Sequence, residues 1–329
     1  MPSFRKIVVT GAAGFVGSHV AEAVTEAYPD SQILLFDKMT YASHSENVMH
    51  LLRDGRVQFL LADLCDADAC VKAATDADLI IHLAAESHVD NSFGNSLLFT
   101  RSNVVGTHTL AEAARMHNVG LFVHVSTDEV YGQILEGDVD ETASLNPTNP
   151  YSASKAAAEM ILNGYMRSYK MPVIMVRANN IFGIRQYPEK IMPTFIMRML
   201  NGQRLQIHGS GQNRRRYLAA TDFAAGVLKI IEKGEIGEAY NIGSDEEFTN
   251  TEVAAMICDL FGRDPKDWVD YVDDRPFNDF RYAISYEKVK ALGWQRRVNV
   301  AQRLPEMVAW YSENQHRYPQ FARFAAANR

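Results

Sequence analysis

The chain has 329 residues, of which 47% are apolar and 22% are charged, as is usual for a globular protein. The formal net charge of −7 gives no electrostatic footprint for nucleic acid, although local groups can still hold an anionic ligand. No stretch approaches the roughly 18 apolar residues of a membrane span, and the first residues lack a signal-peptide pattern, so we expect a cytoplasmic protein.

Strands and helices alternate over the first half of the chain. Apolar runs predict strands, and helical stretches separate them. Because the runs are continuous rather than alternating, the strands are expected to be parallel and buried on both faces. The predicted strands are 6–11, 32–37, 57–64, 77–85, 121–127 and 172–178, and the main predicted helices are 17–28, 69–76, 102–118 and 151–169.

This alternation predicts an α/β fold with a Rossmann-type doubly wound parallel sheet. From about Asn180 the pattern becomes irregular and rich in proline and glycine, with shorter helices at 251–262 and 304–314. We therefore expect a sheet domain at 1–180, to which some later strands return, and a smaller C-terminal substrate lobe formed mainly by 181–329.

A glycine-rich turn, Gly11–Gly17, follows the first predicted strand and opens a helix. Glycines at Gly11, Gly14 and Gly17 would let the backbone approach a pyrophosphate at the helix N-terminus. Asp37 ends the next strand, about 20 residues on, where a carboxylate can accept hydrogen bonds from ribose hydroxyls and would repel a 2′-phosphate. The pattern favours NAD over NADP, and the alternative is a tight turn with a surface Asp.

Tyr151 and Lys155 are spaced as YxxxK, which places both on one face of a helix that starts at Pro150. A cationic Lys beside a Tyr stabilises the phenolate and moves it toward service as a base. The alternative is an exposed surface pair.

Thr127, Asp128 and Glu129 directly follow the strand at 121–127. Residues just past the carboxyl ends of such strands face the ligand crevice. Thr127 can hydrogen-bond a reacting hydroxyl, and two adjacent carboxylates can divide acid and base work if their environments separate their pKa values.

The cysteines, Cys65, Cys70 and Cys258, are odd in number and widely spaced, which argues against a disulfide framework. No Cys/His cluster has zinc-like spacing, so we expect no metal site.

Four segments resemble the nucleoside-diphosphate-glucose 4,6-dehydratases of the extended short-chain dehydrogenase/reductase family. They are STDEVYG at 126–132, HLAAESHVDNS at 82–92, YSASK at 151–155 and QYPEKIMP at 186–193. The resemblance covers nearly the whole chain, and the GxxGxxG spacing of the turn also fits the extended family. STDEVYG is the most specific segment, because the family's epimerases and decarboxylases lack the Asp-Glu pair there.

The resemblance implies NAD as the cofactor and assigns more residues to its binding. An Asp after the third strand is expected near the adenine, and the HLAA segment is expected to run along the cofactor. Beside the glycines, Asp37, Tyr151 and Lys155, the implied cofactor residues are Phe15, Val16, Lys38, Asp63, Leu64, Leu83, Ala84, Ala85 and Thr100, with Asn103 nearby.

The resemblance also implies a reaction in which a nucleotide-linked glucose loses one water. Tyr151, as phenolate, removes the proton of the sugar 4-hydroxyl, which Thr127 orients, while hydride passes from C4 to NAD. Glu129 removes the C5 proton and Asp128 protonates the departing 6-hydroxyl. Hydride then returns to C6, and Glu129 reprotonates C5. The product is a 4-keto-6-deoxy sugar nucleotide, and NAD remains bound.

For the substrate, the resemblance implies contacts to the sugar and to the nucleotide diphosphate. Arginine suits phosphate because its planar fork donates two hydrogen bonds. The residues implied are Ser87, His88, Asn180, Glu189, Lys190, Arg215, Asn241 and Arg275.

Some segments depart from the pattern of bacterial dTDP-glucose enzymes. Ile181, Ile184 and Arg216 stand where those enzymes often have Asn, Pro and Asp. At these positions the sequence is more similar to the UDP-glucose 4,6-dehydratases that begin UDP-rhamnose synthesis. We therefore expect UDP-glucose as substrate. The alternatives are dTDP-glucose, a UDP-sugar 4-epimerase or decarboxylase, and a non-catalytic NAD-binding regulator. Helices around 103–116 and 153–169 carry apolar residues on more than one face, so we also expect a homodimer.

Overall fold

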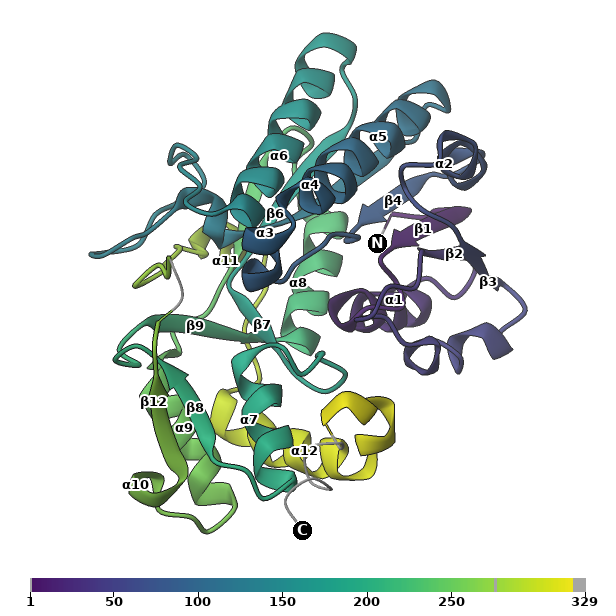
Figure 1. The fold of residues 1–329 in the computed structure, drawn as a ribbon. Helices are drawn as coiled ribbons and strands as arrows, with labels where there is room; N and C mark the ends of the chain where they lie inside the picture. The colour runs from purple at the N-terminus through teal and green to yellow at the C-terminus, as the bar shows by residue number, and fades with distance from the viewer. Residues whose placement is uncertain (1, 275–276, 322–329) are drawn as a thin grey trace.

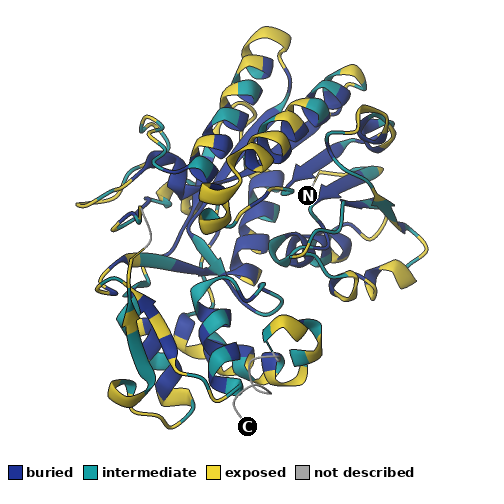
Figure 2. Cartoon of the chain, viewed as in Figure 1, coloured by how far each residue is buried: buried dark blue, intermediate teal, exposed yellow. Residues whose placement is uncertain are grey.

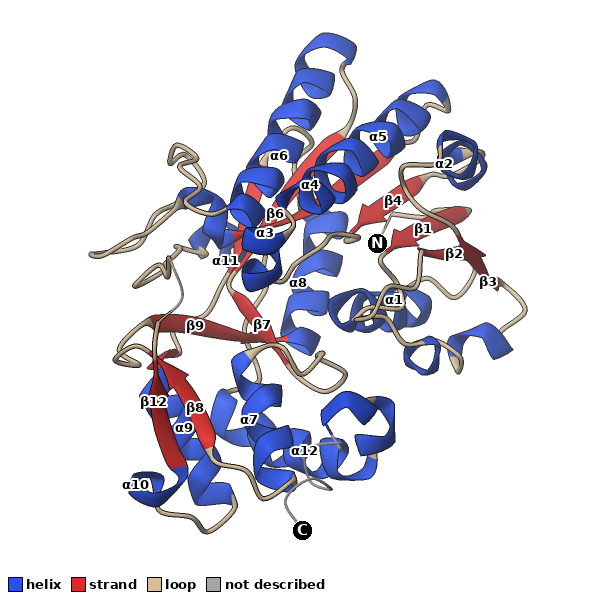
Figure 3. Ribbon diagram, viewed as in Figure 1, coloured by secondary structure: helices blue, strands red, loops and turns tan. Residues whose placement is uncertain are grey.

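The computed structural model describes residues 2–274 and 277–321, and a parallel sheet stands at its centre (Figures 1 and 3). Within these residues the sheet has seven strands, and every neighbouring pair runs parallel. The predicted doubly wound Rossmann-type sheet is therefore confirmed. In spatial order the strands are β10 (Ala239–Ile242), β6 (Val173–Ala178), β5 (Leu121–Thr127), β4 (Leu79–His82), β1 (Lys6–Thr10), β2 (Gln32–Asp37) and β3 (Val57–Leu61).

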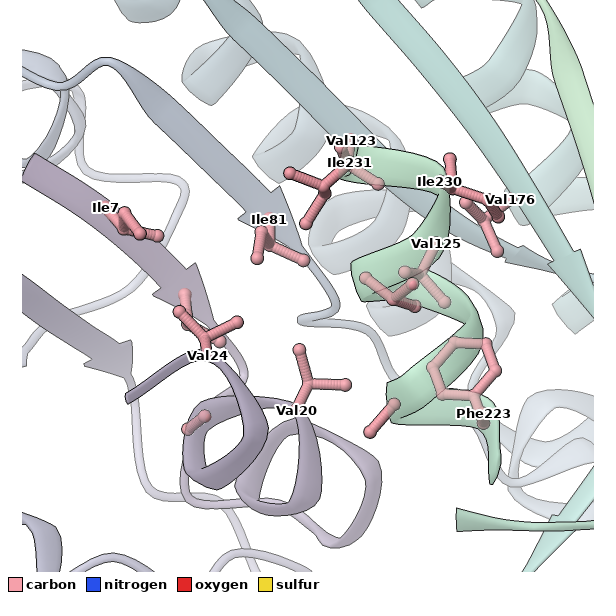
Figure 4. Close-up of a cluster of buried hydrophobic side chains, with 14 of the residues drawn as sticks. Ile7, Val20, Val24, Ile81, Val123, Val125, Val176, Phe223, Ile230 and Ile231 are labelled. Atoms are coloured by element: carbon pink, nitrogen blue, oxygen red, sulfur yellow. The ribbon is translucent and has the colours of Figure 1, made fainter. Parts of the chain in front are cut away.

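Helices cover both faces of the sheet because successive strand residues point to opposite sides. Ile7 and Val9 of β1 join one apolar cluster, whereas Val8 between them joins another. The first cluster packs under α1 (Phe15–Ala27) and α8 (Ala220–Lys233), as Figure 4 shows. The second packs under the helices α2 (Ala67–Ala74), α5 (Gly106–Met116) and α6 (Pro150–Tyr169).

The inner strands β1, β4, β5 and β6 are buried almost throughout, the edge strand β3 is partly exposed, and the outer faces of the helices are exposed (Figure 2). Burying each Val or Ile in these clusters stabilises the fold by about 1.5–3 kcal/mol, which explains why apolar runs marked the strands so clearly in the sequence.

The helix expected at 102–118 begins differently from the prediction. A wider π-helical segment, η3 (Thr100–Val105), precedes α5. Its Asn103 side chain accepts a hydrogen bond from the Glu86 N–H (2.8 Å) and donates to the Glu86 carbonyl (2.9 Å). Through these two bonds the π-helical segment holds the backbone at Glu86, in the loop that follows β4.

The C-terminal residues build a second layer below the sheet with its own apolar core (Figure 1). β10 and α8 nevertheless belong to the central sheet and its covering helices. The strands of this layer are β7 (Asn180–Phe182), β8 (Leu205–His208), β9 (Arg214–Ala219), β11 (Glu247–Thr249) and β12 (Val269–Val272). Its helices are α7 (Ile191–Leu200), α9 (Asn250–Leu260), α10 (Pro265–Trp268) and α12 (Val300–Glu313), followed by the 3₁₀ helix η5 (Gln315–Arg317).

Short helices complete the described chain. They are α3 (Val89–Gly94), α4 (Ser96–Phe99), α11 (Glu287–Ala291), η1 (Ser45–Asn47), η2 (Leu51–Arg53) and η4 (Asp128–Tyr131). Within 2–274 and 277–321, no helix is long and apolar enough to cross a membrane. In the same ranges, no group of three or more His, Cys, Asp or Glu side chains could hold a metal ion.

Candidate active site

The carboxyl ends of the sheet strands open into a cavity of about 480 Å³ that the C-terminal layer closes from the other side. Such a volume is in the range of small-molecule and cofactor sites. The expected catalytic residues Thr127, Asp128, Glu129, Tyr151 and Lys155 all line it. So do the expected cofactor residues Gly11, Gly14, Phe15, Val16, Gly17, Asp37, Lys38, Asp63, Leu64, Leu83, Ala84 and Ala85. The expected substrate residues on the wall are Ser87, His88, Asn180, Glu189, Lys190 and Arg215.

The glycine turn between β1 and α1 is too crowded for side chains. Gly11 has a φ of 67°, and a Cβ there would lie 2.7 Å from the Ala84 Cα. A Cβ on Gly17 would lie 1.9 Å from the Gly11 carbonyl oxygen. Gly14 begins α1 without a side-chain cap, which leaves the first helical N–H groups available to an anion. The turn therefore fits a pyrophosphate.

The Asp37 carboxylate lies at the end of β2, beside this turn. It accepts hydrogen bonds from the Ala13 N–H (3.0 Å), the Met39 N–H (2.7 Å) and the Ser43 hydroxyl (3.1 Å). These bonds hold the carboxylate at the cavity wall, where ribose hydroxyls can reach it. A dinucleotide with an unphosphorylated ribose fits this end of the cavity.

The Lys38 ammonium contacts three polar side chains of the cavity wall beside Asp37. It lies 3.2 Å from a Glu86 carboxylate oxygen and 3.9 Å from one of Asp63, and it donates to the Ser102 hydroxyl (3.0 Å). Ser102 also lines the cavity, and the sequence analysis did not name it.

Asp128 lies in η4, the 3₁₀ turn that starts where β5 ends. The Asn179 side chain donates a hydrogen bond of 2.8 Å to the Asp128 carboxylate. The pKa of Asp128 is nevertheless raised to about 7, mainly because the carboxyl is buried and in part because the charge of Glu129 lies nearby. At neutral pH a large fraction of this carboxyl is protonated, as a general acid requires.

Glu129 is held by the helix that carries Tyr151. Asn149 caps α6 by accepting from the Ser152 N–H (2.9 Å), and its side-chain nitrogen donates to the Glu129 carboxylate (3.1 Å). The Tyr282 hydroxyl lies 3.5 Å from the same carboxylate oxygen. One helix cap therefore fixes the position of Glu129 relative to Tyr151.

Tyr151 and Lys155 lie on one face of α6, but their electrostatics differ from the sequence prediction. Burial raises the pKa of Tyr151 well above its ordinary value, the charges of Glu129 and Asp128 add to this, and a hydrogen bond from Thr127 opposes it. Burial lowers the pKa of Lys155 to about 8, and the Lys155 ammonium donates to the Val125 carbonyl (2.7 Å). The expected lowering of the Tyr151 pKa by Lys155 is not seen, because burial is the largest cause of the shift and raises the pKa.

On the substrate side, the expected residues pair across the cavity. The Tyr41 hydroxyl donates to the Glu189 carboxylate (2.8 Å), and the Lys190 ammonium donates to the Ser87 carbonyl (3.0 Å). His88 lies 3.7 Å from Glu189. These contacts join loops of the sheet to the segment before α7.

Arg215 and Asn180 supply groups suited to a diphosphate. The Arg215 guanidinium stacks over the Tyr282 ring, 4.6 Å from its centre, and donates to the Asp279 carbonyl (2.9 Å). The Asn180 side-chain nitrogen is buried at the cavity and has no hydrogen-bond partner within the described residues. A ligand oxygen would satisfy it.

Two of the expected site residues, Asn241 and Thr100, do not line the cavity. Asn241 is wholly buried in β10, where its side chain accepts from the Tyr131 hydroxyl (2.9 Å) and donates to the Ser285 carbonyl (3.0 Å), so both ends are already used. Thr100 is exposed, and its hydroxyl donates back to the Ser96 carbonyl (3.4 Å) in the preceding helix α4. Arg275 lies outside the described residues.

Besides Ser102, the polar wall residues that the sequence analysis did not single out include Asn149, Asn179, Asp279 and Tyr282. Asn149 could have been found, because an Asn directly before Pro150 is a typical helix start. Asn179 adjoins the predicted Asn180, but no pattern says which of the two faces Asp128.

A model of the family described as GDP-mannose 4,6 dehydratase matches residues 8–307. The chain belongs to this family. The resemblance inferred from the motifs is confirmed.

Relatives within this dehydratase family act on different nucleotides. A trifunctional UDP-glucose 4,6-dehydratase/UDP-4-keto-6-deoxy-D-glucose 3,5-epimerase/UDP-4-keto-L-rhamnose-reductase of Arabidopsis thaliana is 44% identical over 94% of this chain and 47% of its own length. The chain thus spans about half the length of the trifunctional relatives it matches. The dTDP-D-glucose 4,6-dehydratase of Mus musculus is 40% identical over 95% of this chain and 90% of its own length.

A solved member of the dehydratase family has the same fold. The dTDP-glucose 4,6-dehydratase of Streptomyces venezuelae, crystallised with NAD, superposes with a TM-score of 0.93 at 37% identity, covering 96% of this chain and 99% of that one. Its cofactor is the one that the turn and Asp37 predict here.

Proposed function

We propose that this chain is an NAD-dependent enzyme that dehydrates UDP-glucose to UDP-4-keto-6-deoxyglucose, the first step of UDP-rhamnose synthesis. The observation that carries the proposal is the buried Asp128, with its raised pKa, beside Glu129 and Tyr151 in one cavity. An epimerase or a non-catalytic NAD-binding protein has no use for this second acid. The greater identity to the trifunctional UDP-glucose relatives, 44% against 40%, favours UDP-glucose.

dTDP-glucose is the second candidate substrate, because the dTDP-glucose enzymes match over nearly their whole length. A uridine differs from a thymidine by a ribose hydroxyl and a methyl group, and one methyl is worth only about 1–3 kcal/mol in a pocket. Among the described residues, we assign none to reading either group.

The side chains of the site divide the chemistry as follows. Tyr151 takes the proton of the sugar 4-hydroxyl, and Thr127 orients that hydroxyl. NAD, which the glycine turn and the Asp37 carboxylate would hold, would supply the hydride acceptor for C4 and the hydride donor for C6. The positive charge of its oxidised form would favour the Tyr151 phenolate, against the burial that raises the pKa of Tyr151. The 4-ketone acidifies C5, so Glu129 can remove that proton. Asp128, protonated near neutral pH, gives its proton to the departing 6-hydroxyl.

The test is to incubate the purified protein with UDP-glucose and, separately, with dTDP-glucose, adding NAD, and to follow products by mass spectrometry. We expect loss of one water from the UDP sugar at the higher kcat/KM. A preference for the dTDP sugar would keep the chemistry and reverse the substrate. No loss of water from either would refute the dehydratase proposal.

We also propose that the enzyme is a homodimer joined through α5 and α6. Val105, Met116, Met160 and Tyr169 expose apolar surface at or beside these helices. Sedimentation that shows a monomer at micromolar concentration would contradict this proposal.

A further inference from the structure

A chain of hydrogen bonds connects the C-terminal layer to the glycine turn. Arg317, in η5, has a side chain only 5% exposed and donates to the Asn47 side-chain oxygen (2.6 Å) across 270 residues of sequence. Its guanidinium also pairs with the Glu46 carboxylate (2.8 Å) and lies 5.1 Å from the centre of the Trp310 ring. Arg317 therefore contacts Glu46 and Asn47 while its guanidinium packs against the Trp310 ring.

The other end of the Asn47 side chain bonds to the glycine turn. Its side-chain nitrogen donates to the Ala13 carbonyl (2.9 Å), and the same carbonyl accepts from the His44 N–H (3.1 Å). Asn47 is 1% exposed, so water does not replace these bonds easily. Because Arg317 occupies the Asn47 oxygen, the amide is oriented with its nitrogen toward Ala13.

The segment between these contacts, residues 39–47, borders the expected cofactor site. At its start, the Met39 N–H and the Ser43 hydroxyl bond to the Asp37 carboxylate. Thr40, Ala42 and Ser43 line the cavity. Hydrogen bonds therefore join this segment to the Asp37 carboxylate at one end and to the Ala13 carbonyl of the glycine turn at the other.

Aromatic packing from the C-terminal layer supports the same segment. The His44 ring meets the Tyr318 ring edge to face at 5.3 Å, and Tyr318 is wholly buried. Figure 1 shows the yellow C-terminal helices on the side of the molecule where the loop after β2 lies. The polar contacts of Arg317 with Glu46 and Asn47 and the aromatic contact of Tyr318 with His44 thus join residues 44–47 to residues 317–318.

We propose that Arg317 is a positioning residue for the bound dinucleotide: through Asn47 it holds segment 39–47 and the Ala13 carbonyl, so that the C-terminal layer retains NAD between turnovers. This inference rests on the proposed NAD binding. A cofactor that is regenerated in each turnover is useful only if it does not leave, and a free surface loop beside it would open readily. The ties to Arg317 reduce that opening.

The test compares Arg317→Gln with Arg204→Gln as a matched control. Arg204 also forms an ion pair, with Asp270 (2.7 Å), but it lies beside β8 and β12, away from segment 39–47. The rate of NAD release would be measured with a scavenging enzyme that traps free NAD, and the exchange of amide hydrogens in residues 39–47 would be measured without NAD. Arg317→Gln should release NAD about tenfold faster, the change expected for loss of one hydrogen bond to a charged group.

Faster exchange of residues 39–47 should accompany the faster release, and Arg204→Gln should match the wild type in both. If Arg317→Gln releases NAD at the wild-type rate, the inference is wrong and the proposed function stands. If the wild type binds no NAD at all, both fall. Should Arg317→Gln not fold, Arg317→Lys, which keeps the charge but loses the planar fork, takes its place, and wild-type release from it would overturn the inference.

Discussion

Replacing Asn179 with Ala should move the pH dependence of the dehydration step upward. The Asn179 side chain donates to the Asp128 carboxylate at 2.8 Å and lowers the Asp128 pKa, against the burial that raises it to about 7. The donor stabilises the ionised form more strongly than the neutral one, so the pKa of Asp128 should rise when the donor is removed.

The size of the shift follows from the strength of that bond. A hydrogen bond to a charged group contributes about 1.5–3 kcal/mol, and one pKa unit corresponds to about 1.4 kcal/mol, so the rise should be about one to two units. The substitution also leaves the Ser244 N–H, now bonded to the Asn179 side-chain oxygen at 3.0 Å, without a partner. That costs about 1–3 kcal/mol of a total stability near 5–15 kcal/mol, so the variant should fold.

The assay is the pH profile of kcat for water loss. Asp128 must carry a proton to protonate the leaving hydroxyl, so activity falls as the pH rises through its pKa. In Asn179→Ala that alkaline limb should lie at higher pH than in the wild type. Asn201→Ala, which removes an amide bonded to the Met197 carbonyl on α7, is the control and should not move it. A limb that stays in place, or moves to lower pH, would refute the assignment of Asp128 as the acid.

Three further predictions concern the same site. Asp128→Asn should stabilise the protein more at pH 8 than at pH 4. The pKa of Asp128 in the folded protein, about 7, lies above the ordinary value of 3.8 that holds in the unfolded chain, so the carboxyl destabilises the fold increasingly as the pH rises between these values. Equal gains in Tm at both pH values would contradict this. Glu129→Gln should slow water loss by about 10²–10⁴-fold, the usual contribution of a general base, while the absorbance of reduced cofactor still appears on adding substrate; wild-type dehydration would disprove the base assignment. Gly17→Ala should abolish NAD binding, because its Cβ would lie 1.9 Å from the Gly11 carbonyl oxygen, and calorimetry that finds unchanged affinity would count against the cofactor site.

Much of the sheet and the central site could be predicted because local patterns encode them. Continuous apolar runs marked buried parallel strands, and residues that follow such strands, Thr127 to Glu129, must meet at one edge of the sheet. The helical spacing of Tyr151 and Lys155 placed both on one face. None of these inferences needed to know how distant segments pack.

The predictions that differed depend on such packing. Asn241 belongs to a strand, and the sequence does not say which buried hydroxyl or carbonyl its two ends will meet. The raised pKa of Tyr151 reflects how deeply the surrounding elements bury it. The bond from Arg317 to Asn47 joins two unremarkable polar residues that no motif links.

The late entry of α8 and β10 into the sheet has a consequence for synthesis. When residues 1–180 have left the ribosome, the sheet face that carries Ile7 and Val123 still lacks α8, and β6 still lacks its outer neighbour β10. Until about residue 242 emerges, the nascent chain exposes an apolar face and an unpaired strand edge, the two features that draw chaperones and aggregation. The dinucleotide turn is translated well before α8 and β10, so the sheet that supports it is completed only when those later elements have been made.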